Sequence, residues 1–189
     1  MRERKIQMIE VEVKVAVKDK LLIEEKLLQT GFSKGNLLKE SDFYFDSNFN
    51  KLKENDMALR IRSCENLTQD SAESFITFKG PKMDKISMTR KELETKIENA
   101  EIGIEILKSL GYVPVSPVIK LRQEFHLDEI NACLDQVENL GDFLELEIVV
   151  SDENEKADAL NKIISLLHDF GYGADDIIRT SYLSMLQKK

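Results

Sequence analysis

The sequence is poor in the residues that characterise disulfide-stabilised, fibrous and membrane-spanning proteins. Its 189 residues include two cysteines, three prolines, eight glycines and no tryptophan. Because Cys64 and Cys133 lie far apart in unrelated contexts, they predict a reduced, intracellular protein rather than a disulfide framework. No segment has the roughly 20 apolar residues of a membrane span, and the N-terminal MRERKIQ lacks the apolar core of a leader peptide. We therefore expect a cytoplasmic protein that does not contact a membrane.

Positive charge is also in deficit. The chain has 27 lysines and arginines against 35 aspartates and glutamates, which gives a formal net charge of -8. Without an overall basic field, nucleic acid is not an expected partner, and any bound anion must be held by a local cluster of cations. The length is sufficient for one buried core, so we expect residues 1–189 to form a single domain.

What the sequence does contain is a recurring alternation of apolar and charged residues. In MIEVEVKVAV, residues 8–17, the alternate valines share one face of a strand, and Glu10, Glu12 and Lys14 share the other. The same alternation recurs in further segments, at 41–47, 57–63, 74–80, 89–96, 118–125 and 142–150. Each segment predicts a strand with one apolar face and one face of polar or charged groups.

Amphipathic helices are predicted between these strands. Helical patterns run over 19–31, 99–111 and 152–171, and each begins at a capping Asp or Asn and ends at a glycine that an aromatic residue follows. A last short helix is predicted from Ala174 to Gln187. Strands and helices in this arrangement indicate an α+β protein.

The charged faces allow two interpretations. An antiparallel sheet with one solvated face would show the same alternation. However, some strands carry mainly Arg and Lys and others carry paired Glu, which favours a closed barrel with charges inside and helices covering the outside. Such an interior would be strongly cationic and would need an anion with several negative charges. Its cations would be Lys14, Arg60, Arg62, Lys79, Arg90, Lys120 and Arg122.

The glutamates on these faces fall in pairs two residues apart. The pairs are Glu10 with Glu12, Glu92 with Glu94, and Glu145 with Glu147. Carboxylates on one face of a sheet are hard ligands suited to Mg²⁺ or Mn²⁺, which bind through a few carboxylates plus substrate phosphates and water. A polyphosphate site with a metal, or a charged sheet without a catalytic role, would both explain the pattern. The register of the strand that carries Glu92 and Glu94 leaves them either inside or on the surface.

The motifs also resemble the CYTH superfamily, or triphosphate tunnel metalloenzymes. The signature Glu-x-Glu-x-Lys is present as EVEVK, and the segments ALRIR, FKGPK, RKELE, KLRQEF, FLELE and RTSY follow in the family's sequence order. The YFD, ALRIR and KGP segments are most similar to the class IV adenylyl cyclase branch, although Asp142 stands where some cyclases have a histidine. The resemblance implies an eight-stranded antiparallel β-barrel, a triphosphate tunnel with a charged lumen.

The resemblance also implies roles for individual residues. Glu10, Glu12 and Lys14 would be catalytic. The metal, Mg²⁺ or Mn²⁺, would be held by Glu10, Glu12, Glu145, Glu147 and Asp135. The phosphates would be bound by Lys14, Arg60, Arg62, Lys79, Arg90, Lys120, Arg122 and Arg179.

Three functions are compatible with these residues. The first is an adenylyl cyclase that converts ATP to cyclic AMP and pyrophosphate. The second is a hydrolase of inorganic triphosphate, thiamine triphosphate or a nucleoside triphosphate. The third, a domain that binds polyphosphate or nucleotide without catalysis, would not need so many metal ligands. Barrels with an apolar outer face often dimerise, so a homodimer is a further expectation.

Overall fold

The protein is described from a computed structural model, in which residues 9–188 are placed; Met8 and the polar segment before it lie outside the described residues. The strands are β1 (Ile9–Val17), β2 (Ser33–Asp46), β3 (Ala58–Asn66), β4 (Ser71–Lys82), β5 (Arg90–Ile97), β6 (Val113–Pro114), β7 (Val118–Leu127), β8 (Ile130–Val137) and β9 (Gly141–Val150). The α-helices are α1 (Lys20–Thr30), α2 (Ala100–Ser109), α3 (Lys156–Asp169) and α4 (Tyr182–Leu186), with 3-10 turns at Glu153–Glu155 and Ala174–Asp176.

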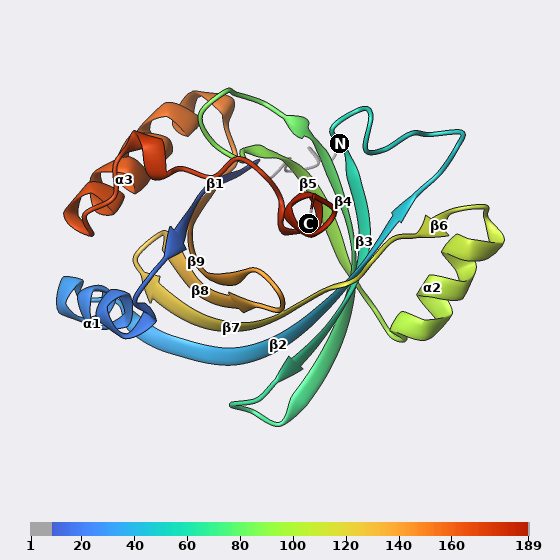
Figure 1. Ribbon diagram of the computed structural model, residues 1–189, viewed down its shortest axis with the longest axis horizontal. Coiled ribbons are helices and arrows are strands. Elements are labelled where there is room, and N and C mark those ends of the chain that lie inside the picture. The colour runs from blue at the N-terminus through green and yellow to red at the C-terminus, as the bar shows by residue number, and fades with distance from the viewer. Residues whose placement is uncertain (1–8, 189) are drawn as a thin grey trace, which may run out of the picture.

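Eight of these strands close into an antiparallel barrel. The strand order in the sheet is β3-β4-β5-β1-β9-β8-β7-β2, and pairing of β2 with β3 completes the ring. The two-residue β6 pairs antiparallel with the end of β2. The ring is seen end-on in Figure 1. The predicted α+β fold with an eight-stranded antiparallel barrel is therefore confirmed.

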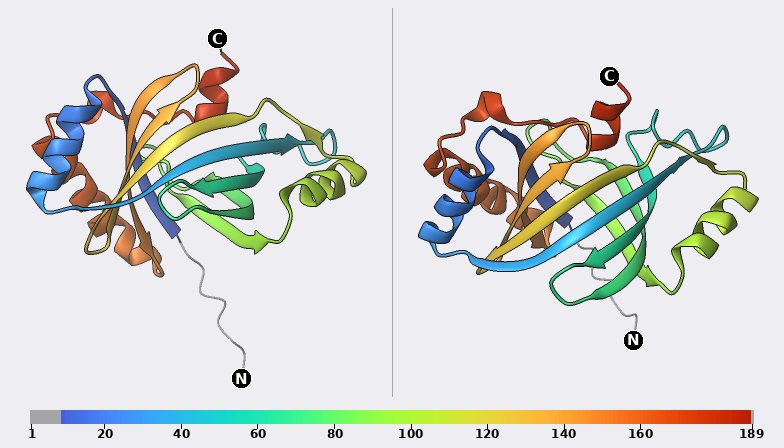
Figure 2. Two further views of the ribbon diagram at one scale, coloured as in Figure 1. Left: turned by 90° about the horizontal axis from the view of Figure 1, so that it is seen from below. Right: turned by 60° about the horizontal axis from the view of Figure 1, so that its bottom comes forward.

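The apolar faces of the strands turn outward and are covered by helices. Val11, Val13 and Val15 are buried in a core that includes Ile23 and Leu27 of α1 and Ile163 of α3. On the opposite flank α2 packs near Ile61 and Ile97. Figure 2 shows α1 and α3 on one side of the barrel and α2 on the other. None of the helices within residues 9–188 is long and apolar enough to cross a membrane.

The predicted helix boundaries hold for α1 and α2. Asp19 caps α1 by accepting the Leu22 N–H at 3.1 Å, and Gly31 ends that helix with a φ of 103°, a left-handed conformation that favours glycine. Asn99 caps α2 in the same way. Asp152, the predicted cap of the third helix, instead caps the 3-10 turn that precedes α3.

The last predicted helix is wrong over its middle part. Between the turn Ala174–Asp176 and the short α4 the chain is extended along β1, where the Ile178 N–H donates to the Lys14 carbonyl at 2.8 Å and Ile177 bridges Val15. The C-terminal segment can bond to β1 here because β1 pairs with β5 only at Ile9 and Glu10. The rest of that edge needs other hydrogen-bond partners, and the C-terminal segment supplies some of them.

Candidate functional site

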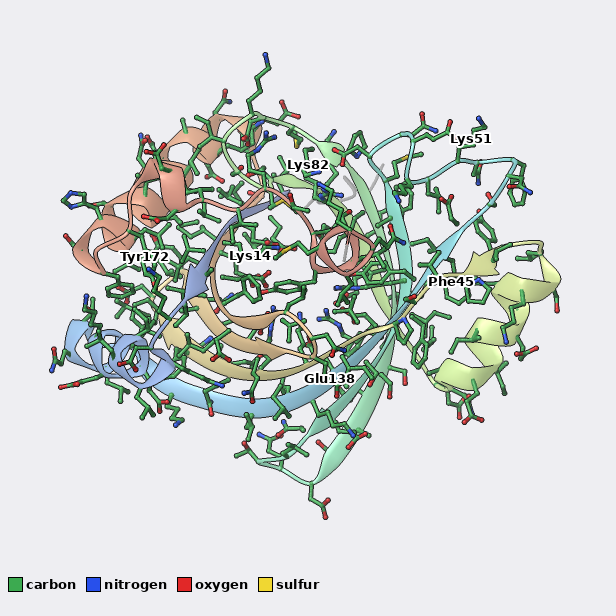
Figure 3. The ribbon with its side chains drawn as sticks, in the orientation of Figure 1. Lys14, Phe45, Lys51, Lys82, Glu138 and Tyr172 are labelled. Carbon is green, nitrogen blue, oxygen red and sulfur yellow. The ribbon has the colours of Figure 1, made fainter. Side chains whose placement is uncertain are left out.

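A cavity of about 980 Å³ runs inside the ring and is lined by the charged faces of the strands. Figure 3 shows Lys14 of β1 in this interior. The lining contains as many aspartates and glutamates as lysines and arginines, so the expectation of a strongly cationic interior is wrong. Buried cations in this barrel are offset mainly by carboxylates of the protein itself, as the cost of burying unpaired charge requires.

The first group of carboxylates is paired with arginines of β3. Arg62 donates to Asp42 at 2.6 Å through Nε and to Glu40 at 2.9 Å through a terminal nitrogen, while Arg60 lies 3.3 Å from Asp42. Burial alone would raise the pKa of Glu40, but Arg62 and then Lys120 outweigh it and lower the value to about 2. For the same reason, with Arg62 and Arg60 as the cations, the pKa of Asp42 lies well below its usual range.

A second paired group surrounds Arg122 of β7. Its Nε donates to Asp135 at 2.7 Å, and one terminal nitrogen contacts both Asp135 and Glu145. Asp135 is fully buried. Lys120 lies 3.5 Å from Asp135, and Lys14, which is only 2% exposed, lies 3.7 Å from Glu145. Burial raises the pKa of Glu145, but Arg122 and Lys14 outweigh it and hold the value well below normal.

Three other carboxylates have no such partner. Among residues 9–188, neither Glu10, Glu12 nor Glu147 forms an ion pair within 4.0 Å. Glu12 stands directly opposite Glu147 in the ladder between β1 and β9, so these two acidic side chains face the lumen from adjacent strands. This group, named here the unpaired carboxylates, is Glu10, Glu12 and Glu147.

The unpaired carboxylates have a higher proton affinity than normal. Burial, followed by the nearby Glu145 and Glu10, raises the pKa of Glu12 to about 7. Burial and Glu10 raise the pKa of Glu147 to about 8, and burial also raises the pKa of Glu10 although Lys79 opposes it. Crowded carboxylates that resist ionisation favour binding of a cation, which relieves their mutual repulsion.

The donor set fits a hard divalent cation. Within residues 9–188 no three acidic, histidine or cysteine side chains converge into a preformed metal site. Mg²⁺ is usually bound through one or two carboxylates, with substrate phosphates and water completing its shell, so an incomplete set of oxygen ligands agrees with this chemistry. Glu10, Glu12 and Glu147 are the residues that would hold Mg²⁺ or Mn²⁺. The predicted metal roles of Glu145 and Asp135 stay predictions, because both carboxylates are engaged by Arg122.

The structure resolves the uncertain position of the β5 glutamates. Glu92 and Glu94 both line the cavity. Lys79 lies 2.5 Å from Glu92, and Arg60 lies 3.7 Å from Glu94, so two predicted phosphate-binding cations hold carboxylates of β5. The register of β5, which the sequence left open, therefore turns both glutamates toward the cavity, with the Glu92 side chain 14% and the Glu94 side chain 43% exposed.

Two predicted phosphate-binding residues lie at the edge of the cavity. Arg90 contacts Asp56, with its guanidinium 3.4 Å from the carbonyl oxygen and 3.8 Å from the carboxylate. Arg179 is exposed and donates to the carbonyl of Asp84 at 2.9 Å and weakly to that of Ser87 at 3.5 Å. Arg179 thus attaches the C-terminal segment to the connection between β4 and β5, and its role as a phosphate ligand stays a prediction.

Sequence reasoning missed three lumen residues. Glu40 and Asp42 hold the β3 arginines, and Tyr182 contacts the lysines of β1 and β7. Asp42 shares the polar face of its strand with Tyr44, so the period-two alternation carried a signal for it. Tyr182 ends the RTSY motif, but no alternation pointed it toward the lumen, because its approach depends on the extended segment before α4.

The raised carboxylate pKa values predict how stability depends on pH without metal. Because Glu12 and Glu147 bind protons more tightly when folded than at the usual pKa of 4.5, the free energy of unfolding should fall as pH rises from about 5 to about 8. Urea unfolding in EDTA at several pH values would measure this decline, and Glu147→Gln should flatten it. A stability that increases steadily from pH 5 to 8 in the wild type would contradict the expectation.

Comparison with known proteins agrees with this architecture. The CYTH domain family matches residues 8–182. "Putative adenylate cyclase MJ0240" of Methanocaldococcus jannaschii is 42% identical over 178 residues, which cover 94% of this chain and 98% of that protein. "Adenylate cyclase CyaB" of Aeromonas hydrophila is 26% identical over 150 residues, covering 79% of this chain and 73% of that protein. The structure of PH1819 from Pyrococcus horikoshii has a TM-score of 0.86 at 33% identity, covering 95% of this chain and 98% of that one.

Proposed function

The chain belongs to the CYTH domain family, and from that premise we propose that it is a metal-dependent enzyme that converts ATP to cyclic AMP and pyrophosphate. The observation that carries the proposal is a group of unpaired carboxylates beside basic side chains that keep free donors. The unpaired carboxylates lie on β1 and β9, and the rest of the lumen is lined by basic side chains of β1, β3, β4 and β7 together with the carboxylates that they contact. A triphosphate with a divalent cation has the complementary charges.

The cations would bind the phosphates through nitrogen donors that their carboxylate partners leave free. A guanidinium has five N–H donors and an ammonium three, so Arg60, Arg62 and Lys120 can keep their carboxylates and still contact phosphate oxygens. The carboxylates hold these donors in fixed directions before substrate arrives. Such preorganisation stabilises the charge that develops on phosphate oxygens in the transition state.

The reaction needs in-line geometry more than a protein nucleophile. The ribose 3′-hydroxyl oxygen would bond to the α-phosphorus while the bond to the bridging oxygen of pyrophosphate breaks, and the hydroxyl proton would pass to water in the tunnel. A divalent cation, when bound by the unpaired carboxylates, would neutralise phosphate charge and increase the acidity of a hydroxyl group that it contacts. Lys14, fixed opposite Glu145 in the ladder between β1 and β9, would contact the same triphosphate.

The names of two relatives favour the cyclase over the alternative. The relatives are named "Putative adenylate cyclase MJ0240" and "Adenylate cyclase CyaB", so both names refer to cyclase activity. The same lumen residues would also suit hydrolysis, in which water attacks the γ-phosphorus and orthophosphate leaves. The two reactions differ in their products rather than in the charges that they require.

A product assay tests the proposal. Purified protein with Mg²⁺ or Mn²⁺ would be incubated separately with ATP and with inorganic triphosphate, and the products resolved by anion-exchange chromatography. We expect cyclic AMP and pyrophosphate from ATP, and no product from the Glu10→Gln, Glu12→Gln double variant. Release of orthophosphate from inorganic triphosphate, with ATP unchanged, would identify the activity as a triphosphatase instead of a cyclase. No turnover of either compound with either metal would refute both.

A further inference from the structure

Tyr182, the first residue of α4, lies where two lysines of the lumen meet. The Lys14 Nζ is 4.1 Å from the centroid of its ring, and the Lys120 Nζ is 5.3 Å from the same centroid. A cation within about 6 Å of an aromatic ring face is attracted by the quadrupole of the ring. One ring therefore attracts an ammonium from β1 and another from β7, two strands that are not neighbours in the sheet.

The ring is itself held in place on two sides. The Tyr182 hydroxyl donates to Asp135 at 3.0 Å, and the ring meets Phe143 edge to face with 5.0 Å between centroids. The side chain is only 7% exposed. Burial, with the nearby Glu145 and Asp135, raises the pKa of Tyr182 well above its usual value, so the hydroxyl stays protonated and remains a donor.

The backbone before Tyr182 is attached to the strand that carries Lys14. The hydrogen bond from Ile178 to the Lys14 carbonyl and the bridge between Ile177 and Val15 fix this segment beside the lysine. The Ser181 hydroxyl then caps α4 by accepting the Ser184 N–H at 3.2 Å. Tyr182 therefore enters the lumen from a segment whose position along β1 is defined at Lys14. Figure 1 shows the C-terminal helix over the opening of the ring.

A ring face has an effect on these ammoniums that a carboxylate does not have. Lys14 and Lys120 already lie near acidic groups, at 3.7 Å from Glu145 and 3.1 Å from Glu40. A further carboxylate in the place of the ring would neutralise more of this positive charge and occupy more of the ammonium donors. The ring attracts the positive charge without accepting a conventional hydrogen bond, so N–H donors remain available to an anionic oxygen.

We propose that Tyr182 is a positioning residue, which holds Lys14 and Lys120 together as a pair of ammoniums that bind the phosphates of the substrate. That these lysines bind phosphate rests on the proposed function, whereas their position beside the ring is observed in the structure. It assigns the C-terminal segment a part in the site, which is therefore completed from outside the eight strands of the barrel.

Binding of inorganic triphosphate without divalent metal tests the proposal separately from catalysis. Isothermal titration calorimetry would compare the wild type with Tyr182→Leu, Tyr182→Phe and Phe143→Leu. We expect Tyr182→Leu to bind about tenfold more weakly, because two cation–π contacts are lost. Tyr182→Phe keeps the ring and should stay within about threefold of the wild type. Phe143→Leu removes the edge-to-face contact but leaves the Tyr182 hydroxyl bonded to Asp135, so the ring stays beside both lysines and this variant should also bind nearly as the wild type does.

A spectroscopic measurement distinguishes positioning from packing. In protein labelled at lysine, the ε-methylene signals of Lys14 and Lys120 should be shifted upfield by the ring, and each can be assigned from its Lys→Arg variant. The shift should persist in Tyr182→Phe and Phe143→Leu and disappear in Tyr182→Leu. Thermal unfolding of every variant would show that each is folded under the conditions used.

Several outcomes would overturn the inference. Equal weakening in Tyr182→Phe and Tyr182→Leu would mean that the hydroxyl matters and the ring does not. Equal weakening in Phe143→Leu would attribute the effect to packing alone. Lysine signals without a ring shift in the wild type would also refute it, even if triphosphate binds. By contrast, ring-shifted lysines in a wild type that binds no triphosphate, either alone or with Mg²⁺ or Mn²⁺, would refute the proposed function and leave the positioning of the lysines established.

Discussion

Replacing Glu12 or Glu147 by glutamine is expected to lower metal-dependent turnover of the triphosphate substrate by about a hundredfold or more. Each change removes one anionic oxygen from a ligand set that is already incomplete within the described residues. A single electrostatic group in an active site typically contributes about 10²- to 10³-fold in rate. Because Glu12 and Glu147 face each other on β1 and β9, the two single variants should behave alike and their effects should not add.

The stability of these variants should change in the opposite direction from their activity. Without metal at pH 8, glutamine removes a buried negative charge whose pKa is raised by burial and by neighbouring carboxylates, so unfolding should need as much urea as in the wild type or more. Calorimetric titration with Mn²⁺ should show weaker binding at the same time. Glu138→Gln, at an exposed position, is the matched control and should change neither quantity. Loss of activity together with loss of folding would contradict a metal role.

The arrangement of the strands was largely readable from the sequence because the period of a strand is two residues. In β1 the valines and the charged residues alternate without interruption, so the face of each side chain followed directly. The same was true of Arg60 and Arg62 on β3 and of Glu145 on β9. A sheet with one wet face has the same local pattern, so closure into a barrel was favoured only by the segregation of basic and acidic strands, and the number of strands came from the family resemblance.

The pairing of charges could not be read in this way, because it depends on contacts between strands that are distant in the sequence. Arg122 of β7 faces Asp135 by register, but its contact with Glu145 requires the position of β9 as well. A list of basic lumen residues therefore suggested a cationic interior, whereas the folded barrel pairs most of them with acids. The resemblance assigned Glu145 to the metal; in the structure this carboxylate contacts Arg122, and its metal role stays a prediction.

The C-terminal segment shows a second reason for the difference. Residues 174–187 have helical character in the sequence, yet the middle of this range is extended because the free edge of β1 offers hydrogen bonds. Tertiary contacts of this kind override local propensity. Tyr182 could not be placed in the lumen until this segment was placed.

Replacing Arg122 by methionine is expected to produce the largest loss of stability among single substitutions in the lumen. The change leaves the fully buried Asp135 with Lys120 as its remaining ion partner, and it removes the contact that Arg122 makes with Glu145. Breaking a buried ion pair by removing one partner typically costs roughly 3–5 kcal/mol, which for a chain of this size lowers the melting temperature by about 10 °C. Urea unfolding and calorimetry at pH 7 would measure both quantities.

The pH dependence of this variant separates lost electrostatics from lost packing. In the wild type, Glu145 has a lowered pKa because Arg122 and Lys14 outweigh the effect of burial, so its contribution to stability is present at neutral pH and is lost as pH falls below the usual 4.5. In Arg122→Met, Glu145 has lost the first of these two cations, so acid neutralises this carboxylate more readily than in the wild type. The stability difference from wild type should therefore shrink between pH 7 and pH 4. Lys162→Met, which breaks an exposed pair with Glu129, should leave stability nearly unchanged at either pH, because solvent screens such a pair. A deficit in Arg122→Met that stays constant with pH would instead assign the effect to the volume and shape of the arginine, and the lumen charges would then contribute little to folding.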